Sequence, residues 1–292
     1  MTDHTETSKS IETALVTGAS SGIGYELAVL LARHGFDLVL VSRNRAALTG
    51  LASRVTAEFG VKSTVYPTDL SERGSARELF TQIQKDGITI DCLVNNAGFA
   101  MQGPLVDQDN ATLLDMLEVN VTALTHLIRL FLPGMVDRGH GRILNVASIG
   151  AFIPGPMTAA YFASKAYVLS LSEALSNEVH GTGVTVTAMC PGPTRTKFAQ
   201  RARLTESKAF RGNVMEADSV ALEGFEAMMK GRAVVIPGFK HRIQLFPTPL
   251  VPRRVLAYFA RQYHETPNKG MEAAKDKWEA TPAPAAGRPA HQ

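Results

Sequence analysis

The stretch TGASSGIG, residues 17–24, lies between an apolar run, Ala14–Thr17, and an amphipathic pattern over Gly24–His34. A glycine-rich turn that follows a strand and opens a helix is typical of dinucleotide-binding folds, because the helix N-terminus offers N–H groups to a diphosphate. Glycine occurs in many strand-to-helix turns, but here both neighbouring segments have the required pattern. The stretch therefore predicts a nucleotide-binding unit near the N-terminus.

The three glycines of this stretch have separate expected roles. Gly18 permits the tight turn, Gly22 lets the backbone approach the diphosphate, and Gly24 lets the helix pack closely on the strand. We expect the same cofactor site to include the other loop residues Ser20, Ser21 and Ile23.

Short apolar runs and amphipathic segments alternate through the rest of the chain. The predicted strands are Ala14–Thr17, Asp37–Ser42, Lys62–Tyr66, Cys92–Asn95, Arg142–Ser148, Gly183–Cys190 and Ala233–Ile236. The predicted helices include Gly24–His34, Ala46–Phe59, Ala76–Lys85 and Thr112–Leu132. Apolar strands bounded by helices indicate a parallel sheet covered on both faces, and right-handed crossovers then give a doubly wound α/β fold.

Composition divides the chain into four parts. Residues 1–10 are polar and predicted to be flexible, and 11–238 form the dinucleotide-binding catalytic domain. Residues 239–264 mix bulky apolar and basic side chains between prolines. This C-terminal extension is either a set of helical turns packed over the domain or an interfacial or pocket-capping segment. Residues 265–292 are rich in Pro, Ala, Lys and Glu, which predicts a mobile tail.

The whole-chain composition narrows the functional classes. The 292 residues are 45% hydrophobic, enough for a sizeable core, and 30 basic minus 27 acidic residues leave a charge of only +3, which gives no argument for nucleic-acid binding. We expect no secretion signal, no stretch approaching the ~20 apolar residues of a membrane span, and no metal site, because the eight histidines lack ligand spacing. Cys92 and Cys190 lie in apolar runs and are expected to be buried free thiols of a cytoplasmic protein.

The second predicted strand ends in Ser42 and Arg43. Sites that prefer NAD usually carry Asp or Glu at this place to hold the ribose hydroxyls. A hydroxyl and a guanidinium would instead hold the 2′-phosphate of NADP (NADPH) by charge-assisted hydrogen bonds, unless Arg43 is only a solvated residue at a strand end. Asp69, followed by Leu70, would contact the adenine amine or serve as a turn or N-cap aspartate.

Tyr161 and Lys165 are four residues apart in YFASK, and Tyr161 is thirteen residues after Ser148. On a helix this spacing places both side chains on one face. A phenol has a pKa of about 10, and a neighbouring ammonium favours the phenolate, so we expect Lys165 to lower the pKa of Tyr161. Tyr161 would then exchange a proton with an alcohol or carbonyl oxygen that Ser148 also hydrogen-bonds.

These residues, in this order, resemble the short-chain dehydrogenase/reductase family in its compact, Rossmann-like, single-domain form. Besides TGASSGIG, Ser148 and YFASK, the resemblance rests on NNAG at 95–98, Asn120 in VNV, and PGPTRT at 191–196. It implies an oxidoreductase that transfers a hydride between NADP(H) and a small-molecule carbonyl or secondary alcohol. The alternatives are a non-catalytic nucleotide-sensing scaffold on the same fold and a reductase that works at a membrane surface.

The resemblance also implies residue roles. Asn120 would interrupt a helix and hold a water that links Lys165 to solvent, and Lys165 would bind the nicotinamide ribose as well. The remaining residues expected to contact the cofactor are Asn96, Ala97, Gly98, Pro191, Gly192, Thr194 and Thr196. Apolar residues surround much of the circumference of two predicted helices, Thr112–Leu132 and Ala159–Val179. In the family, these two helices commonly form the contact between subunits. A homodimer or homotetramer is therefore expected.

Substrate selection in this family lies mainly in loops near Phe99–Pro104 and Ile149–Met157 and in the segment Arg195–Val214. The apolar residues expected to favour an apolar or mixed carbonyl compound are Phe99, Met101, Phe152, Ile153, Met157 and Phe198. Arg195, Arg201 and Arg203 leave an acidic substrate open.

Overall fold

The computed structural model of the chain describes residues 11–198, 212 and 214–264. The expected flexible N-terminus and mobile tail, together with Arg201 and Arg203, lie outside the described residues.

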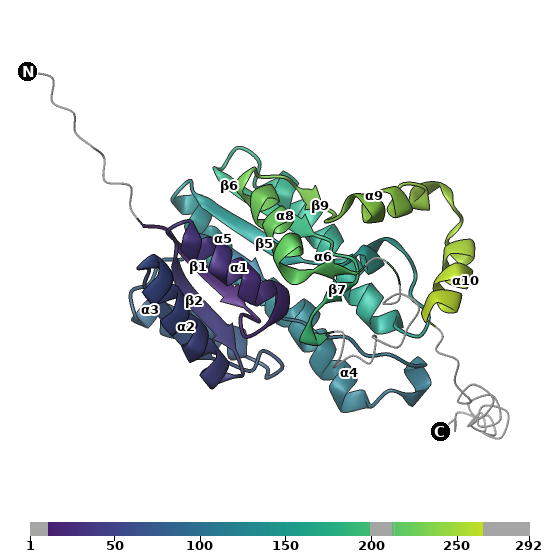
Figure 1. Ribbon diagram of the computed structural model, residues 1–292, viewed down its shortest axis with the longest axis horizontal. Coiled ribbons are helices and arrows are strands. Elements are labelled where there is room, and N and C mark those ends of the chain that lie inside the picture. The colour runs from purple at the N-terminus through teal and green to yellow at the C-terminus, as the bar shows by residue number, and fades with distance from the viewer. Residues whose placement is uncertain (1–10, 199–211, 213, 265–292) are drawn as a thin grey trace, which may run out of the picture.

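A seven-stranded parallel sheet crosses the middle of the protein (Figure 1). In spatial order its strands are β3 (Ser63–Pro67), β2 (Asp37–Ser42), β1 (Thr13–Thr17), β4 (Cys92–Asn95), β5 (Gly141–Val146), β6 (Val184–Met189) and β9 (Val234–Val235). Every predicted strand is present, so the doubly wound, Rossmann-like prediction is confirmed. The strand order reverses between β1 and β4, and in such sheets ligands bind outside the carboxyl ends of the strands at this reversal.

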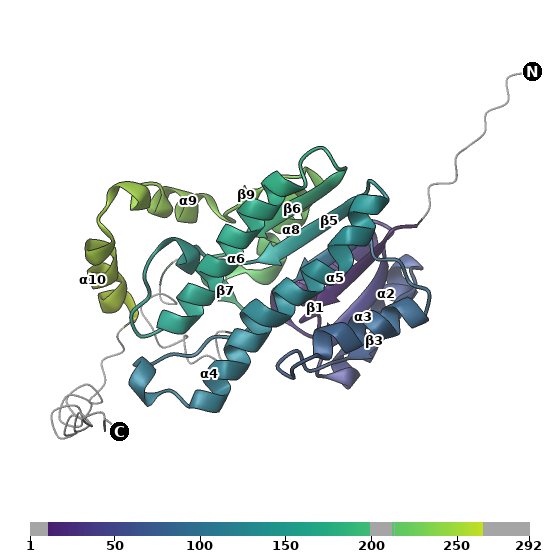
Figure 2. The same ribbon diagram turned by 180° about the vertical axis from the view of Figure 1, so that it is seen from behind.

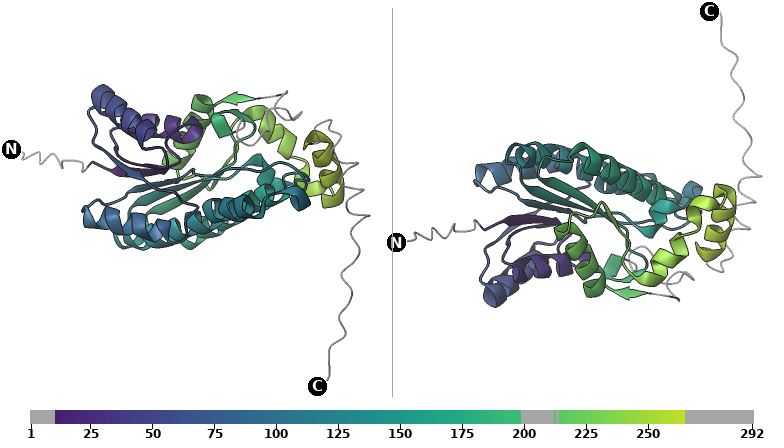
Figure 3. Two further views of the ribbon diagram at one scale, coloured as in Figure 1. Left: turned by 90° about the horizontal axis from the view of Figure 1, so that it is seen from below. Right: turned by 90° about the horizontal axis from the view of Figure 1, so that it is seen from above.

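Helices cover both faces of the sheet (Figures 2 and 3). One layer contains α1 (Gly22–Arg33), α2 (Arg45–Phe59) and α8 (Ala217–Met229), and the other contains α3 (Ser75–Lys85), α5 (Leu124–Asp137) and α6 (Ala159–Glu178). Successive strand side chains point to opposite faces, so the neighbours Leu15 and Val16 of β1 belong to separate hydrophobic cores. Both cysteines are buried and free, as the apolar runs around them predict.

The helix predicted over Thr112–Leu132 is divided in the structure. It consists of α4 (Asn110–Leu117), a π-helical turn over Glu118–Ala123, and α5, which continues to Asp137. Contrary to expectation, the stretch Asn110–Asp137 is long and apolar enough to cross a membrane by length and composition. Because its α5 residues Leu127 and Met135 are buried against the sheet, this stretch is a core helix of the domain.

The C-terminal extension forms α9 (Phe239–Leu245), a 3-10 turn over Thr248–Leu250, and α10 (Arg253–His264). These elements project beyond the sheet, at the end away from the described N-terminal residues (Figure 1). His241, Leu245 and Ala260 are buried, whereas most other side chains of the segment are exposed. The extension therefore packs on the domain through a few residues and leaves a broad outer surface.

Candidate active site

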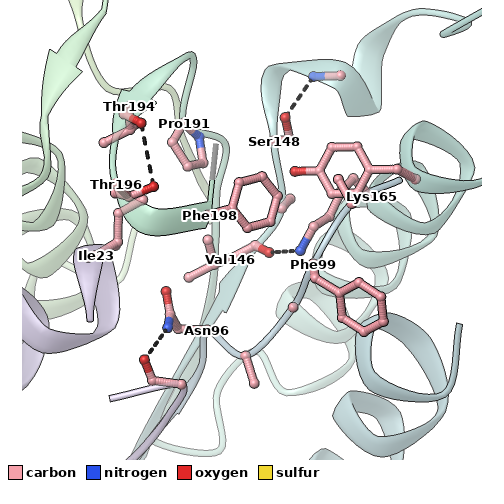
Figure 4. A pocket seen from close by; sticks show the side chains of 18 of the residues that line it. Ile23, Asn96, Phe99, Val146, Ser148, Lys165, Pro191, Thr194, Thr196 and Phe198 are labelled. Atoms are coloured by element: carbon pink, nitrogen blue, oxygen red, sulfur yellow. Dashed lines mark hydrogen bonds between the residues drawn. The ribbon is translucent and has the colours of Figure 1, made fainter. Parts of the chain in front are cut away.

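A cleft of about 1110 Å³ lies at the carboxyl ends of the strands. Its walls come from the loop after β1, from the ends of β2, β4, β5 and β6, and from α9 and α10. Figure 4 shows the middle of this cleft, where Asn96, Ser148, Lys165 and Pro191 come together from segments far apart in the sequence. The position is the one that the reversal in strand order predicts.

The side chain of Asn96 supports the glycine-rich loop through hydrogen bonds to its backbone. The Asn96 amide Nδ2 donates to the carbonyl oxygens of Thr17, at 3.0 Å, and Gly18, at 3.3 Å. A Cβ on Gly24 would lie 2.2 Å from this Nδ2 atom, and Gly18 has φ +66°, so neither glycine is replaceable without displacing the amide or straining the turn. Asn96 thus supports the loop, a role that the sequence did not indicate, in addition to lining the cleft.

The N-terminus of α1 has the properties of an anion site. Ser21 is its N-cap residue and makes no capping hydrogen bond through its side chain, and the first turn holds no acidic residue. The N–H groups and the positive end of the helix dipole are therefore available to a diphosphate. Gly22 faces Thr196 so closely that an added Cβ would lie 2.9 Å from the threonine Cγ2. These residues fit a dinucleotide lying along the loop.

At the adenosine end of the cleft, Arg43 pairs with Asp69. The Arg43 Nη1 and Asp69 Oδ2 atoms are 3.5 Å apart, and the arginine side chain is 69% exposed. Burial raises the pKa of Asp69, but hydrogen bonds from Ser71 and the charge of Arg43 outweigh it and hold the pKa below its ordinary value. The Asp69 Oδ1 atom accepts from Ser71 N and Oγ, as a turn aspartate does. The sequence did not indicate this ion pair, because the two residues follow different strands.

The proposed proton-transfer residues meet at the end of β5 and the start of α6. Ser148 is the N-cap residue of a short 3-10 helix, and its Oγ accepts from Gly150 N at 3.1 Å. The buried Tyr161 ring lies between Phe162 and Phe198, with ring centroids at 6.0 and 5.8 Å. Hydrogen bonding to Ser148 is one influence on the phenol pKa. The sequence-predicted constellation is therefore brought together.

The electrostatics of Tyr161 and Lys165 differ from the prediction. Burial raises the pKa of Tyr161 to about 12, with Ser148 acting in the opposite direction. Burial lowers the pKa of Lys165 to about 8. The Lys165 Nζ donates to the Val146 carbonyl at 2.7 Å and lies 5.9 Å from the centroid of the tyrosine ring. The pKa of Tyr161 is thus shifted upwards and not downwards as expected, because burial outweighs the hydrogen bond with Ser148.

Asn120 lies within the π-helical turn, so the expected interruption of a helix is present. Its Oδ1 accepts from Phe99 N at 3.1 Å, and its Nδ2 donates to Phe99 O and Ser164 Oγ. A Cβ on Gly98 would lie 2.9 Å from this Oδ1 and 3.4 Å from Lys165 Nζ. The side chains of Asn120 and Lys165 therefore both approach the backbone of Gly98, and a larger residue would not fit there. The role of Asn120 in holding a water stays a prediction.

The segment after β6 crosses the cleft floor. Ile149 N donates to Pro191 O at 3.0 Å, and Thr194 Oγ1 donates to Gly192 O at 2.9 Å. The buried His241 ring from α9 lies against Gly192, where an added Cβ would be 2.3 Å from the ring Cε1. The C-terminal extension therefore reaches the floor of the cleft, which agrees with the pocket-capping alternative, although the sequence did not single out His241.

The other end of the cleft is mainly apolar. Its apolar lining residues are Phe99, Ala100, Met101, Ile149, Ile153, Phe162, Phe198, Leu245, Leu256 and Phe259. Phe152 and Met157, which the sequence predicted here, do not line it. Phe152 packs against the core beneath α6, and Met157 O instead accepts from Gly103 N. Leu245, Leu256 and Phe259, which the sequence analysis did not single out, come from α9 and α10, the segment for which it left a pocket-capping role open. Among the described residues, no cluster of three His, Cys, Asp or Glu side chains could hold a metal ion.

Comparison with known proteins supports the same family and the same fold. Residues 12–207 match the short chain dehydrogenase family. A short-chain dehydrogenase from Sphingobium yanoikuyae, solved in complex with NADPH, is 30% identical with a TM-score of 0.74, over 95% of this chain and 99% of that one. The bulky-bulky ketone specific alcohol dehydrogenase from Comamonas testosteroni is 27% identical with a TM-score of 0.70, over 96% and 98% of the two chains.

A very-long-chain 3-oxoacyl-CoA reductase from Laccaria bicolor is 36% identical over 175 residues, which are 59% of this chain and 52% of that protein. The chain thus spans about half the length of this curated relative. A dinucleotide fold with Ser, Tyr and Lys in its cleft is typical of nicotinamide-dependent oxidoreductases. The chain belongs to the short-chain dehydrogenase/reductase family.

Proposed function

We propose that this protein is an NADPH-linked reductase of bulky, apolar ketones (EC 1.1.1.-), with Tyr161 as the proton donor. The observation that carries this proposal is the position of Tyr161, which adjoins Ser148 at the apolar end of a cleft whose opposite end carries Arg43. The Comamonas testosteroni relative, whose match covers nearly the whole of both chains, is specific for bulky-bulky ketones. The Sphingobium yanoikuyae relative was solved with NADPH.

The chain's own residues supply positioning and the proton. The bound nicotinamide would deliver the hydride to the carbonyl carbon, and the proton would pass from the Tyr161 hydroxyl to the carbonyl oxygen. Ser148 would hydrogen-bond that oxygen and hold the ketone in place. A raised pKa keeps the phenol protonated at neutral pH, which suits a general acid in the direction of reduction.

Two features favour a neutral, apolar ketone over a charged substrate. Aromatic and aliphatic side chains form most of the lining at the Tyr161 end. Among the described residues that line this end, Lys165 carries an amino group, and this group already donates to the Val146 carbonyl. An anionic group would therefore lose its hydration without gaining a cationic partner.

The selection of NADPH over NADH rests on Arg43. Its guanidinium is the cation at the end of β2, and Ser42 and Asn44 add hydrogen-bonding groups to the lining. Asp69 already pairs with Arg43, so the 2′-phosphate would share or displace this partner. The exposed ion pair is weak enough for such exchange.

The test is turnover of NADPH and NADH against a panel of ketones graded in size, with a 3-oxoacyl thioester included. We expect the highest kcat/KM for NADPH with a ketone that carries two large apolar groups. Cofactor binding without turnover of any carbonyl compound would instead favour the nucleotide-sensing scaffold. Selectivity for the thioester would overturn the proposed substrate class but leave the reductase in place.

We also propose that the enzyme is cytoplasmic and self-associates through α4, α5 and α6. The outer face of α6 exposes the small residues Ala163, Ser170 and Ala174 beside Tyr167, whose hydroxyl lies 3.1 Å from Thr125 Oγ1 of α5. Small side chains let helices of two subunits approach closely. Sedimentation of the full chain at micromolar concentration tests this, with a homodimer or homotetramer expected and a strictly monomeric mass against it.

A further inference from the structure

The C-terminal extension exposes more large apolar side chains than any other part of the described structure. Nearly half of such exposed side chains belong to it, although it is a short part of the chain. They are Phe239, Ile243, Phe246, Leu250, Val255, Tyr258 and Phe259. Phe246 and Leu250 are 83% and 85% exposed. Single exposed apolar residues are ordinary, but a concentration of them in one short segment indicates an interaction surface.

In α9 the apolar residues form one outward stripe. Phe239, Ile243 and Phe246 recur at helical spacing of four and three residues, so they share a face. The buried His241 and Leu245 lie on the opposite side, against the domain. An amphipathic helix normally buries its apolar face, whereas α9 buries one face and still presents a second apolar face to solvent.

In α10 the same arrangement recurs. Val255, Tyr258 and Phe259 share an exposed face by their spacing, and Ala260 lies on the buried side. The helix begins with Arg253 and Arg254, both exposed. Among the described residues, no carboxylate pairs with either of these two arginines or with Lys240 on α9.

The charge of the segment has one sign. Residues 239–264 contain Lys240, Arg242, Arg253, Arg254 and Arg261 and no Asp or Glu. Of these, Arg242 is paired with Glu223 of α8. Apolar stripes flanked by cations are the pattern of helices that lie in the interface of a bilayer, with the apolar side chains among acyl chains and the cations near anionic headgroups.

The same charges argue against a second copy as the occupant. In a two-fold contact each residue faces the same patch of the partner, so cations would meet cations with no carboxylate in the patch to offset them. An anionic lipid surface satisfies the apolar side chains and the charges together. Charge complementarity therefore selects the bilayer.

We propose that α9, α10 and the turn between them dock the protein on an anionic bilayer through Phe239, Ile243, Phe246, Leu250, Val255 and Tyr258. Other residues of these helices, Gln244, Leu245, Leu256 and Ala260, line the cleft. The wall of the substrate site and the docking surface are thus two sides of one pair of helices. A membrane-dissolved apolar ketone would reach the cleft from the lipid, and only this last step rests on the proposed function.

The experiment is co-sedimentation of the full chain with two kinds of vesicle, phosphatidylcholine alone and phosphatidylcholine mixed with phosphatidylserine. We expect binding to the mixed vesicles that weakens with salt, and little binding to phosphatidylcholine alone. The double variants Phe246→Ser/Leu250→Ser and Arg253→Gln/Arg254→Gln should each weaken binding at least about tenfold. The first loses apolar side chains that would be buried among acyl chains. The second loses two cations, each of which raises the affinity for an anionic surface roughly fivefold. The matched control is Val106→Ser/Leu222→Ser, which removes exposed apolar residues elsewhere.

Each outcome decides the proposal. None of these residues lines the cleft, so all variants should reduce a small water-soluble ketone at the rate of the parent. No sedimentation with either vesicle, or equal losses in the control, would overturn the proposal. A sedimentation mass that falls in Phe246→Ser/Leu250→Ser, without vesicle binding in the parent, would assign the surface to a second copy instead. Vesicle binding by a protein that reduces no ketone would leave the docking intact and remove the proposed function.

Discussion

The two ends of the cleft are built by different means. At the nucleotide end, backbone groups of the loop after β1 face the site, and Asn96 fixes that loop through two carbonyl oxygens. At the substrate end, side chains from α6, α9 and α10 and from the loops after β4, β5 and β6 form an apolar wall. A backbone site tolerates little change, because added atoms collide with the amide beneath Gly24, whereas a side-chain wall can be altered residue by residue. This difference in construction agrees with the proposal that the first end binds the cofactor and the second selects the substrate.

The largest effect should come from the point where the two ends meet. We expect Tyr161→Phe to lower kcat about 10²–10⁴-fold, because general acid catalysis typically contributes that much, while cofactor affinity stays unchanged. The ring packing between Phe162 and Phe198 is kept, since only the hydroxyl is lost. Steady-state kinetics and cofactor titration measure both quantities. Tyr167→Phe on the exposed face of the same helix is the control, and a Tyr161→Phe rate within threefold of the parent would exclude Tyr161 as the proton donor.

Lys165→Met should be about as damaging to turnover and should also weaken cofactor binding, if the ammonium serves the ribose as well. The pH dependence of the free energy of unfolding gives a second test, because it reports whether Lys165 carries a buried charge. The folded-state pKa of about 8 lies below the ordinary 10.5, so the unfolded chain holds more protons between these values. In the parent, this group makes stability rise with pH over that window, at up to about 1.4 kcal/mol per pH unit.

Unfolding by denaturant at pH 7, 8, 9 and 10 measures this dependence. We expect the variant to lose the part of the rise that Lys165 contributes, and Lys230→Met, which removes an exposed lysine paired with Glu226, to keep it. A variant that keeps both the pH dependence and the nucleotide affinity would show that Lys165 neither carries the buried charge nor binds the ribose.

Arg43→Asp tests the adenosine end. The change removes a charged hydrogen bond to the 2′-phosphate, worth about 1.5–3 kcal/mol, and adds repulsion, so NADPH kcat/KM should fall at least tenfold. NADH efficiency should hold or rise, because a carboxylate can accept from the ribose hydroxyls. Arg45→Asp, two residues further on and exposed, is the matched control. An unchanged ratio of the two coenzymes would leave Arg43 as a solvated residue paired with Asp69.

The same contrast explains which features the sequence could reveal. The strands, the glycine loop and the Ser148, Tyr161 and Lys165 constellation depend on local patterns or on motifs in a fixed order, and the structure contains them where expected. The Arg43–Asp69 pair, the support of the loop by Asn96 and the wall from α9 and α10 depend on tertiary packing of distant segments. The pKa of Tyr161 also depends on burial, which spacing alone does not give.

A smaller effect is expected from a substitution of Asp69, the acidic partner in the Arg43–Asp69 ion pair. Asp69→Asn removes the carboxylate partner of Arg43 and keeps an oxygen for the Ser71 hydrogen bonds. Because an exposed pair contributes up to about 1 kcal/mol, the freed guanidinium should lower the KM for NADPH by up to about fivefold and leave NADH unchanged. If Asp69 instead holds the adenine amine, both coenzymes should bind more weakly. Parallel kinetics with the two coenzymes separate these outcomes.

An effect of similar size, but confined to bulky substrates, should come from the apolar wall. Leu256 of α10 lines the cleft and is only partly buried, so Leu256→Ala removes part of the apolar contact to a large ketone without opening the main core. Loss of three partly buried carbons corresponds to roughly 1 kcal/mol, or about a fivefold rise in KM for a bulky ketone. A small ketone does not reach the wall, so its KM should stay within error. The measurement is the ratio of KM values for the two ketones in the parent, in Leu256→Ala, and in the α8 surface control Leu222→Ala. Equal changes for both ketones would mean that α10 acts on the protein as a whole, and the substrate wall would then be confined to the loops that precede α6.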